Sequence, residues 1–151
     1  MKLVHNKVLV TLTCATIAVA ALAVTPPAKF VMLRGYRVAQ AMNSPMGVRS
    51  MGLEIDSIMF RDDVTRVYGK LTGPHNTSMR IDKIVMTAAG KKTESNDIDG
   101  FDYTRAFQWE EDGVIPVEID FAPMKERSAS SFVLSATTPK GIANWTVTKK
   151  K

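Results

Sequence analysis

The stretch Ile115-Pro116-Val117-Glu118-Ile119-Asp120-Phe121 decides the fold class, because its apolar residues stand at every second position. A side-chain period of two is that of a β-strand with one buried and one solvent-facing side. The stretch therefore predicts a strand whose apolar side chains enter a core, while Glu118 and Asp120 face water.

The same alternation recurs on both sides of this strand. Phe132–Ala136 and Asn144–Thr148 alternate in the same way, and Val67 and Leu71 are spaced evenly around Gly69. About seven strands in roughly 100 residues predict an all-β fold, an antiparallel immunoglobulin-like sandwich. A lipocalin-type barrel is the less favoured alternative, because about 110 residues is short for eight long strands around a cavity.

Two of the predicted strands change phase midway. The changes fall between Leu53–Ile55 and Ile58–Phe60, and between Met79–Ile81 and Ile84–Met86. Such a change marks either a β-bulge or a strand that passes from one sheet to the other.

Aromatic residues gather near one further predicted strand. Tyr103, Phe107 and Trp109 share a face of that strand with Arg105, and Trp145 lies on a later strand. They either line a platform for a glycan or peptide or belong to the core. We favour the core, because a domain with few aromatic residues needs them there.

The N-terminus predicts a signal peptide or membrane anchor over residues 1–24. Two lysines precede Val8–Val24, a run of 17 residues without charge. Ala21-Leu22-Ala23 supplies the small residues that signal peptidase accepts before its cleavage position. Ala39-Gln40-Ala41 is a second candidate for cleavage. Export with cleavage is favoured over membrane attachment through an uncleaved helix at residues 8–24, and a cytosolic buried helix is the third alternative.

Cys14, the only cysteine, lies in this run and is read as a small apolar residue rather than a lipidated one.

The rest of the chain divides into three predicted parts. Residues 25–50 are a connector, in which Pro26-Pro27 interrupts the leader and residues 28–41 form a weak helix or a flexible tether. Residues 51–148 form the β-sandwich domain, and residues 149–151 are a basic tail.

The net charge of +5 is not distributed evenly. Residues 1–41 carry five basic residues and no acidic one, so residues 42–151 hold 15 of each. Because the predicted folded part is neutral, the sequence gives no support for a nucleic-acid partner.

An acidic loop is the strongest candidate for a metal site. Asp97, Asp99 and Asp102 surround Gly100 in a pattern similar to a calcium loop. An EF-hand is excluded, because position 12 of the loop would be Ala106 instead of Glu. The alternatives are a shallow calcium site at these three carboxylates and a solvated acidic turn, which we favour.

No catalytic constellation is apparent. His75 is the only histidine outside the leader, and it stands in a predicted turn. Zinc sites of the Cys/His type and triads built on histidine therefore lack residues. We expect a non-catalytic module without a cofactor. The alternative is a small metal-dependent hydrolase that uses Asp97, Asp99 and Asp102 together with His75.

Two parts of the chain carry a family resemblance. They are the leader and the segment Glu111–Phe121, in which an acidic turn leads into a strand. It resembles the uncharacterised immunoglobulin-like sandwich domains of exported bacterial envelope proteins. This resemblance implies a periplasmic or envelope location and a role in binding a protein or glycan partner or in supporting an assembly. It implies no catalytic residues.

Overall fold

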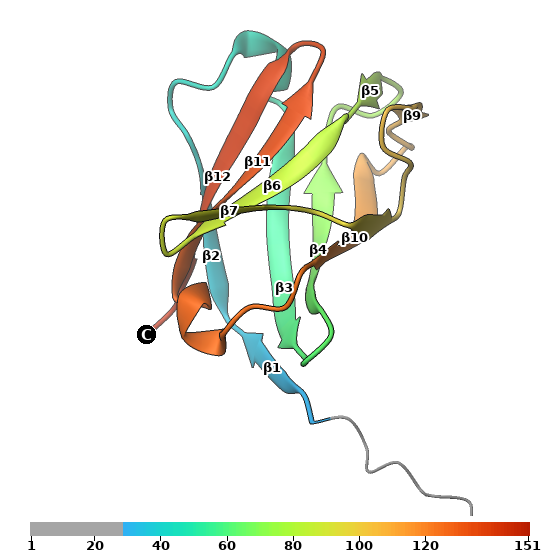
Figure 1. Ribbon diagram of the computed structural model, residues 1–151. Coiled ribbons are helices and arrows are strands. Elements are labelled where there is room, and N and C mark those ends of the chain that lie inside the picture. The colour runs from blue at the N-terminus through green and yellow to red at the C-terminus, as the bar shows by residue number, and fades with distance from the viewer. Residues whose placement is uncertain (1–28) are drawn as a thin grey trace, which may run out of the picture.

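The computed structural model describes residues 29–151, which form twelve strands and two short 3-10 helices (Figure 1). No helix in this part of the chain is long and apolar enough to cross a membrane. The strands are β1 (Val31–Arg34), β2 (Tyr36–Gln40), β3 (Gly52–Phe60), β4 (Thr65–Thr72), β5 (Ser78–Arg80), β6 (Lys83–Ala88), β7 (Lys91–Glu94), β8 (Asp97–Asp99), β9 (Ala106–Gln108), β10 (Val114–Phe121), β11 (Ser131–Thr138) and β12 (Gly141–Lys149), and the 3-10 helices are η1 (Met46–Val48) and η2 (Glu126–Ala129).

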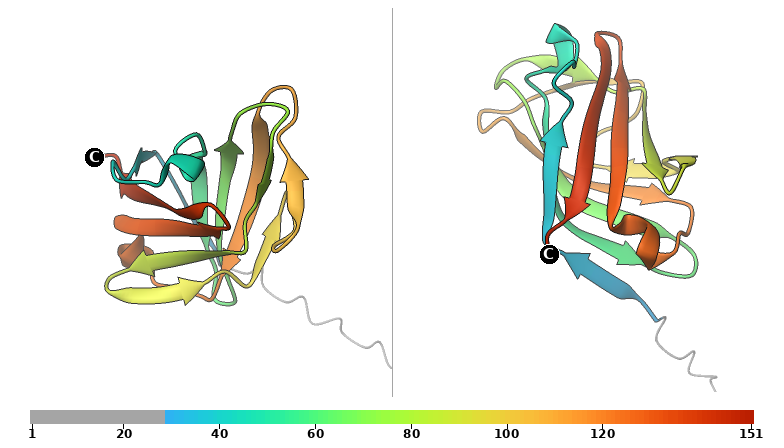
Figure 2. Two further views of the ribbon diagram at one scale, coloured as in Figure 1. Left: turned by 90° about the horizontal axis from the view of Figure 1, so that it is seen from above. Right: turned by 90° about the vertical axis from the view of Figure 1, so that its left-hand side faces the viewer.

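Ten of the strands form two antiparallel sheets that pack face to face (Figure 2). Sheet A has the strand order β1-β3-β4-β10-β8, and sheet B has the order β2-β12-β11-β6-β7. The remaining strands, β5 and β9, pair with each other. The fold is all-β, as the sequence predicts. Because neither sheet closes on itself, the barrel alternative is wrong.

The core lies between the two sheets and follows the predicted alternation. In β10, Val117, Ile119 and Phe121 are buried, and Ile115 is half-buried. Their partners from sheet B include the buried Leu134 and Trp145. Full burial of a side chain of this size contributes about 1.5–3 kcal/mol to stability, so the alternation holds the two sheets together.

Both predicted changes of phase are confirmed, one as a β-bulge and the other as a passage between sheets. The register between β3 and β4 shifts between Ile55 and Ser57, which makes the first change a β-bulge. The second change is a passage between sheets, because β5 pairs with β9 while β6 lies in sheet B.

The prediction of a weak helix or tether over residues 28–41 is wrong. The chain forms β1 at the edge of sheet A and then β2 at the edge of sheet B, and Leu33 and Tyr36 pack against the core. Gly35 lies between these strands with φ +81°, a conformation that suits glycine, and turns the chain from one sheet to the other. We call this passage the first crossing. The arginines in β1 and β2 obscured the alternation because they lie on the solvent side.

A second crossing joins the two sheets at their opposite edges. Strand β7 ends sheet B, β8 ends sheet A, and only Ser95 and Asn96 separate them. The backbone N–H of Ser95 donates to the Ile84 carbonyl of sheet B (2.9 Å). The N–H of Asn96 donates to the Asp120 carbonyl of sheet A (2.8 Å).

The prediction of one continuous strand through Tyr103 and Trp109 is also wrong. Only Ala106–Gln108 is a strand, and Thr104 has a positive φ of 64° in the preceding turn. Arg105 is exposed and pairs with Asp102 (3.5 Å) instead of stacking on the core. The total of twelve strands exceeds the expected seven because five of them have only three or four residues, too few to show a period.

Candidate functional site

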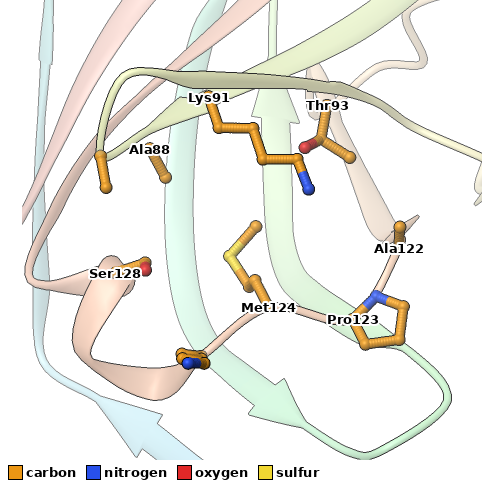
Figure 3. A pocket seen from close by; sticks show the side chains of 9 residues that line it. Ala88, Lys91, Thr93, Ala122, Pro123, Met124 and Ser128 are labelled. Carbon is orange, nitrogen blue, oxygen red and sulfur yellow. The ribbon is translucent and has the colours of Figure 1, made fainter.

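A groove lies between strand β7 and the segment that joins β10 to η2 (Figure 3). Its volume is about 370 Å³. Its floor and walls combine small apolar side chains, one methionine, two lysines and two hydroxyl groups. The residues are Ala88, Ala89, Lys91, Thr93, Ala122, Pro123, Met124, Lys125 and Ser128.

The local sequence explains why the chain leaves this space open. After Phe121 the chain departs from sheet A, and Pro123 cannot donate a backbone hydrogen bond to extend the strand. The N–H of Met124 donates instead to the Thr65 hydroxyl (3.0 Å), which fixes the segment against the start of β4. Opposite it, the small side chain of Ala88 leaves the wall of sheet B open.

Strand β7 presents an unpaired edge beside this groove. In the described part of the chain, it pairs with β6 on one side only and is the last strand of sheet B. Because Ser95 donates to Ile84, the alternation of an antiparallel ladder makes Thr93 and Lys91 the hydrogen-bonded positions toward β6. The N–H and C=O groups of Lys92 and Glu94 therefore point away from β6, toward the solvent.

The groove is bordered by positive charge. The Lys91 side chain extends from β7 toward the groove (Figure 3). Lys125, from the segment between β10 and η2, is a second lysine among the lining residues. No carboxylate is among its lining residues, and the hydroxyls of Thr93 and Ser128 can donate or accept. This combination suits an extended peptide segment with an acidic side chain that enters the groove.

The acidic loop predicted from the sequence lies elsewhere, on β8 and the following turn. Asp97 and Asp99 are exposed on β8, and an Asp97 carboxylate oxygen accepts from the N–H of Ile98 (2.9 Å). Asp102 is exposed and paired with Arg105. Within residues 29–151, no group of three His, Cys, Asp or Glu side chains is arranged to hold a metal ion. The calcium site and the hydrolase that would use it stay predictions.

The outer surface of sheet A is nevertheless strongly charged. Arg66 of β4 donates two hydrogen bonds to Asp120, at 2.6 and 2.7 Å, and one to Glu118 at 3.3 Å. The bond to Asp120 raises the pKa of the Arg66 guanidinium above its usual value. A hollow of about 230 Å³ lies nearby, and Asp56, Asp99 and Glu118 are among the residues that line it. Glu118 and Asp120 thus face outward, as predicted, and in addition form an ion-pair network.

The aromatic residues divide between core and rim. Trp109 and Trp145 are fully buried, so the favoured core prediction is confirmed for both. Phe107 packs between Phe101 and Trp109, with ring centroids 4.7 and 5.2 Å away, and is half-buried. Tyr103 shares a hydrogen bond with Ser95 in the second crossing (2.6 Å), and burial raises its pKa to about 12.

The other candidates identified from sequence are exposed or outside the described residues. His75 and the acidic turn Glu110–Asp112 are exposed at the ends of strands. The leader, Cys14 and the cleavage position after Ala23 lie in residues 1–28, outside the described part. The second cleavage candidate, after Ala41, follows β2, so cleavage there would remove an edge strand from each sheet.

Sequence reasoning missed the groove and strand β7. Ala89-Gly90-Lys91-Lys92 is typical of a turn, and the four residues after Gly90 show no apolar alternation. The only available signal was Thr93, a residue common in strands, between charged neighbours.

Comparison with protein-family models, with curated proteins and with solved structures finds no match for this chain.

Proposed function

We propose that this protein is a non-catalytic module of the cell envelope, with an immunoglobulin-like sandwich, that binds an extended segment of a partner protein along strand β7. The leader supports export, with residues 1–24 either cleaved or kept as an anchor. The observation that carries the binding role is the unpaired edge of β7 beside a groove with a basic border.

The chemistry of strand addition fits this location. A partner strand would gain main-chain hydrogen bonds from Lys92 and Glu94, and side chains at alternate positions would give specificity in the groove. Lys91 and Lys92 favour an acidic segment.

Site-specific photo-cross-linking in the native host tests the proposal. A photoreactive benzoylphenylalanine replaces Thr93 at the groove or, as the matched control, Asp99 on β8, the edge strand of sheet A that follows β7. We expect an adduct of defined mass from position 93 and none of that mass from position 99. The same adduct from both positions would contradict a site on β7, and an adduct whose mass moves on glycosidase treatment would identify a glycan instead.

Two substitutions at one residue separate strand addition from simple proximity. Lys92→Pro removes an outward N–H without breaking the ladder to β6, whereas Lys92→Ala removes the charge and keeps that N–H. We expect Lys92→Pro to abolish the adduct from position 93 and Lys92→Ala to retain most of it. Thermal unfolding of the purified variants checks that both remain folded. Equal cross-linking in the two variants would exclude main-chain pairing.

A further inference from the structure

One end of the domain, which we call the basic end, gathers positive charge from three distant parts of the chain. Strand β1, helix η2 and the end of β12 meet there (Figure 1). The N–H of Lys150 donates to the Gly35 carbonyl (2.8 Å), and that of Lys149 donates to the Ser130 carbonyl (3.0 Å). The basic tail predicted at residues 149–151 is therefore joined to the first crossing.

Eight basic residues belong to this end, and their charge is largely uncompensated. Within residues 29–151, none of the eight forms an ion pair with a carboxylate. The acidic residues nearby are Glu126 in η2 and Asp62 and Asp63 in the turn after β3, where Asp63 pairs with Arg61 (3.0 Å). The eight are Lys29, Arg34, Arg37, Lys125, Arg127, Lys149, Lys150 and Lys151.

Exposed apolar side chains lie in the same place. Phe30, Val31 and Met32 are consecutive residues that are 59 %, 43 % and 37 % exposed. The alternation of β1 directs Leu33 toward the core, so Phe30 and Met32 share the outer side of the strand with Arg34. Exposed apolar groups set among lysines and arginines are typical of proteins that bind an interface between water and lipid.

The preceding sequence brings this end close to the uncharged run. Only residues 25–28 separate Val24 from Lys29, so even a fully extended chain keeps the two within about 17 Å. We propose that the basic end rests on an anionic phospholipid surface, with Phe30 and Met32 at the lipid boundary and the lysines and arginines near the phosphates. A nucleic acid would use the charge but would leave the apolar side chains without a role. The proposal shares the envelope location and Lys125 with the proposed function, but it makes no use of strand β7.

Fluorescence of the full-length chain in vesicles tests this orientation. Cys14→Ala removes the only cysteine, and Met32→Cys then carries an environment-sensitive nitrobenzoxadiazole label. Met46→Cys, an exposed site in η1 at the other end of the domain, is the matched control. Vesicles contain phosphatidylcholine alone or with about 30 % phosphatidylglycerol, plus a lipid with a nitroxide near its headgroup. Anionic lipid should attract the basic end over about one Debye length.

We expect quenching and a blue shift for the label at position 32 in the anionic vesicles, several-fold greater than at position 46. About 0.5 M salt should reduce the effect, because it shortens the Debye length to about 4 Å. Reversing the charge of Lys149, Lys150 and Lys151 with glutamate should reduce it as well. Equal quenching at both positions, or equal quenching in neutral and anionic vesicles, would overturn the proposal.

Three further measurements separate this inference from its alternatives. Lys92→Pro should leave quenching at position 32 unchanged, so loss of partner binding at β7 and loss of lipid contact are distinguishable. Phe30→Ser should reduce the quenching. Binding of a double-stranded DNA oligomer that Phe30→Ser leaves unchanged, without quenching by anionic vesicles, would assign the basic end to a nucleic acid instead.

Discussion

The two crossings perform the same task by different physical means. At the first crossing, the chain passes from β1 in sheet A to β2 in sheet B through Gly35, whose positive φ makes the turn. At the second, it passes from β7 to β8 through Ser95 and Asn96, which are held by hydrogen bonds to both sheets and to Tyr103. One passage depends on backbone conformation and the other on polar contacts. The first should therefore respond to substitutions that disfavour its backbone conformation or its packing on the core, and the second to pH.

Truncation of Tyr36 should have the largest effect, because this residue joins the first crossing to the core. Its ring is buried and meets Phe132 edge-on, with centroids 6.2 Å apart. Tyr36→Ala should cost about 3–5 kcal/mol in a urea unfolding experiment, through lost burial and the remaining cavity. Tyr36→Phe is the matched control. Because the buried hydroxyl has no hydrogen-bond partner within residues 29–151, its removal should change stability by less than about 1 kcal/mol.

A large loss in Tyr36→Phe would contradict this assignment. It would mean that the hydroxyl, rather than the packed ring, secures the first crossing.

Substitution of Gly35 should have an intermediate effect. No atom of residues 29–151 lies within 4 Å of the position that a Cβ atom would occupy, so the cost comes from backbone conformation alone. Gly35→Val should lower the free energy of unfolding by about 1–3 kcal/mol, because a β-branched residue strongly disfavours a φ of +81°. Gly35→Asn should cost less, since asparagine tolerates this region. If urea unfolding gives the same midpoint for Val and Gly, the positive φ does not determine the crossing.

The second crossing should weaken at high pH, with the smallest effect of the three. Burial, aided by Asp97 and Glu94, raises the pKa of folded Tyr103 to about 12, from 10.0 for an ordinary tyrosine. A raised pKa favours the protonated folded state, so this stabilisation is complete below pH 10 and is lost as pH rises from 10 to 12. After allowance for partial exposure, the loss should be roughly 1–2 kcal/mol.

Comparison of the wild type with Tyr103→Phe isolates this contribution, because every other ionisable group is the same in the two proteins. Urea unfolding at several pH values between 9 and 12 should show a steeper decline for the wild type. Parallel curves would exclude Tyr103 as the source of the pH dependence.

The sequence predicted those parts of the fold that consist of long alternating strands. β10, β11 and β12 each have eight or nine residues, which is long enough for an alternation with a period of two to be recognised in the sequence. Both crossings were missed, because β1, β7 and β8 have only three or four residues. β1 and β8 each pair with a strand that lies far away in the sequence, and β7 pairs with β6 across the turn at Ala89-Gly90, so no periodic pattern of their own marks these strands.

The candidate site could not be predicted for a related reason. Its two walls come from residues 88–93 and 122–128, and neither segment carries a motif. The groove forms because β7 is the last strand of its sheet and because Pro123 stands where β10 ends. The position of β7 in the sheet is a property of the topology. The acidic loop had the clearer pattern in the sequence, yet Asp97 and Asp99 lie exposed on an edge and Asp102 pairs with Arg105.

The first crossing also determines how the domain would respond to mechanical load. Tension applied through residues before Lys29 reaches β1 first, and β1 is joined to sheet A by only four residue pairs with β3. Beyond Gly35 the load must break the five pairs between β2 and β12 and withdraw the buried Tyr36. β1 would thus detach first, while most of the core stays intact. Its departure would leave the edge of β3 at Ser57–Phe60 unpaired, so that pulling on the chain would expose a new strand-accepting edge.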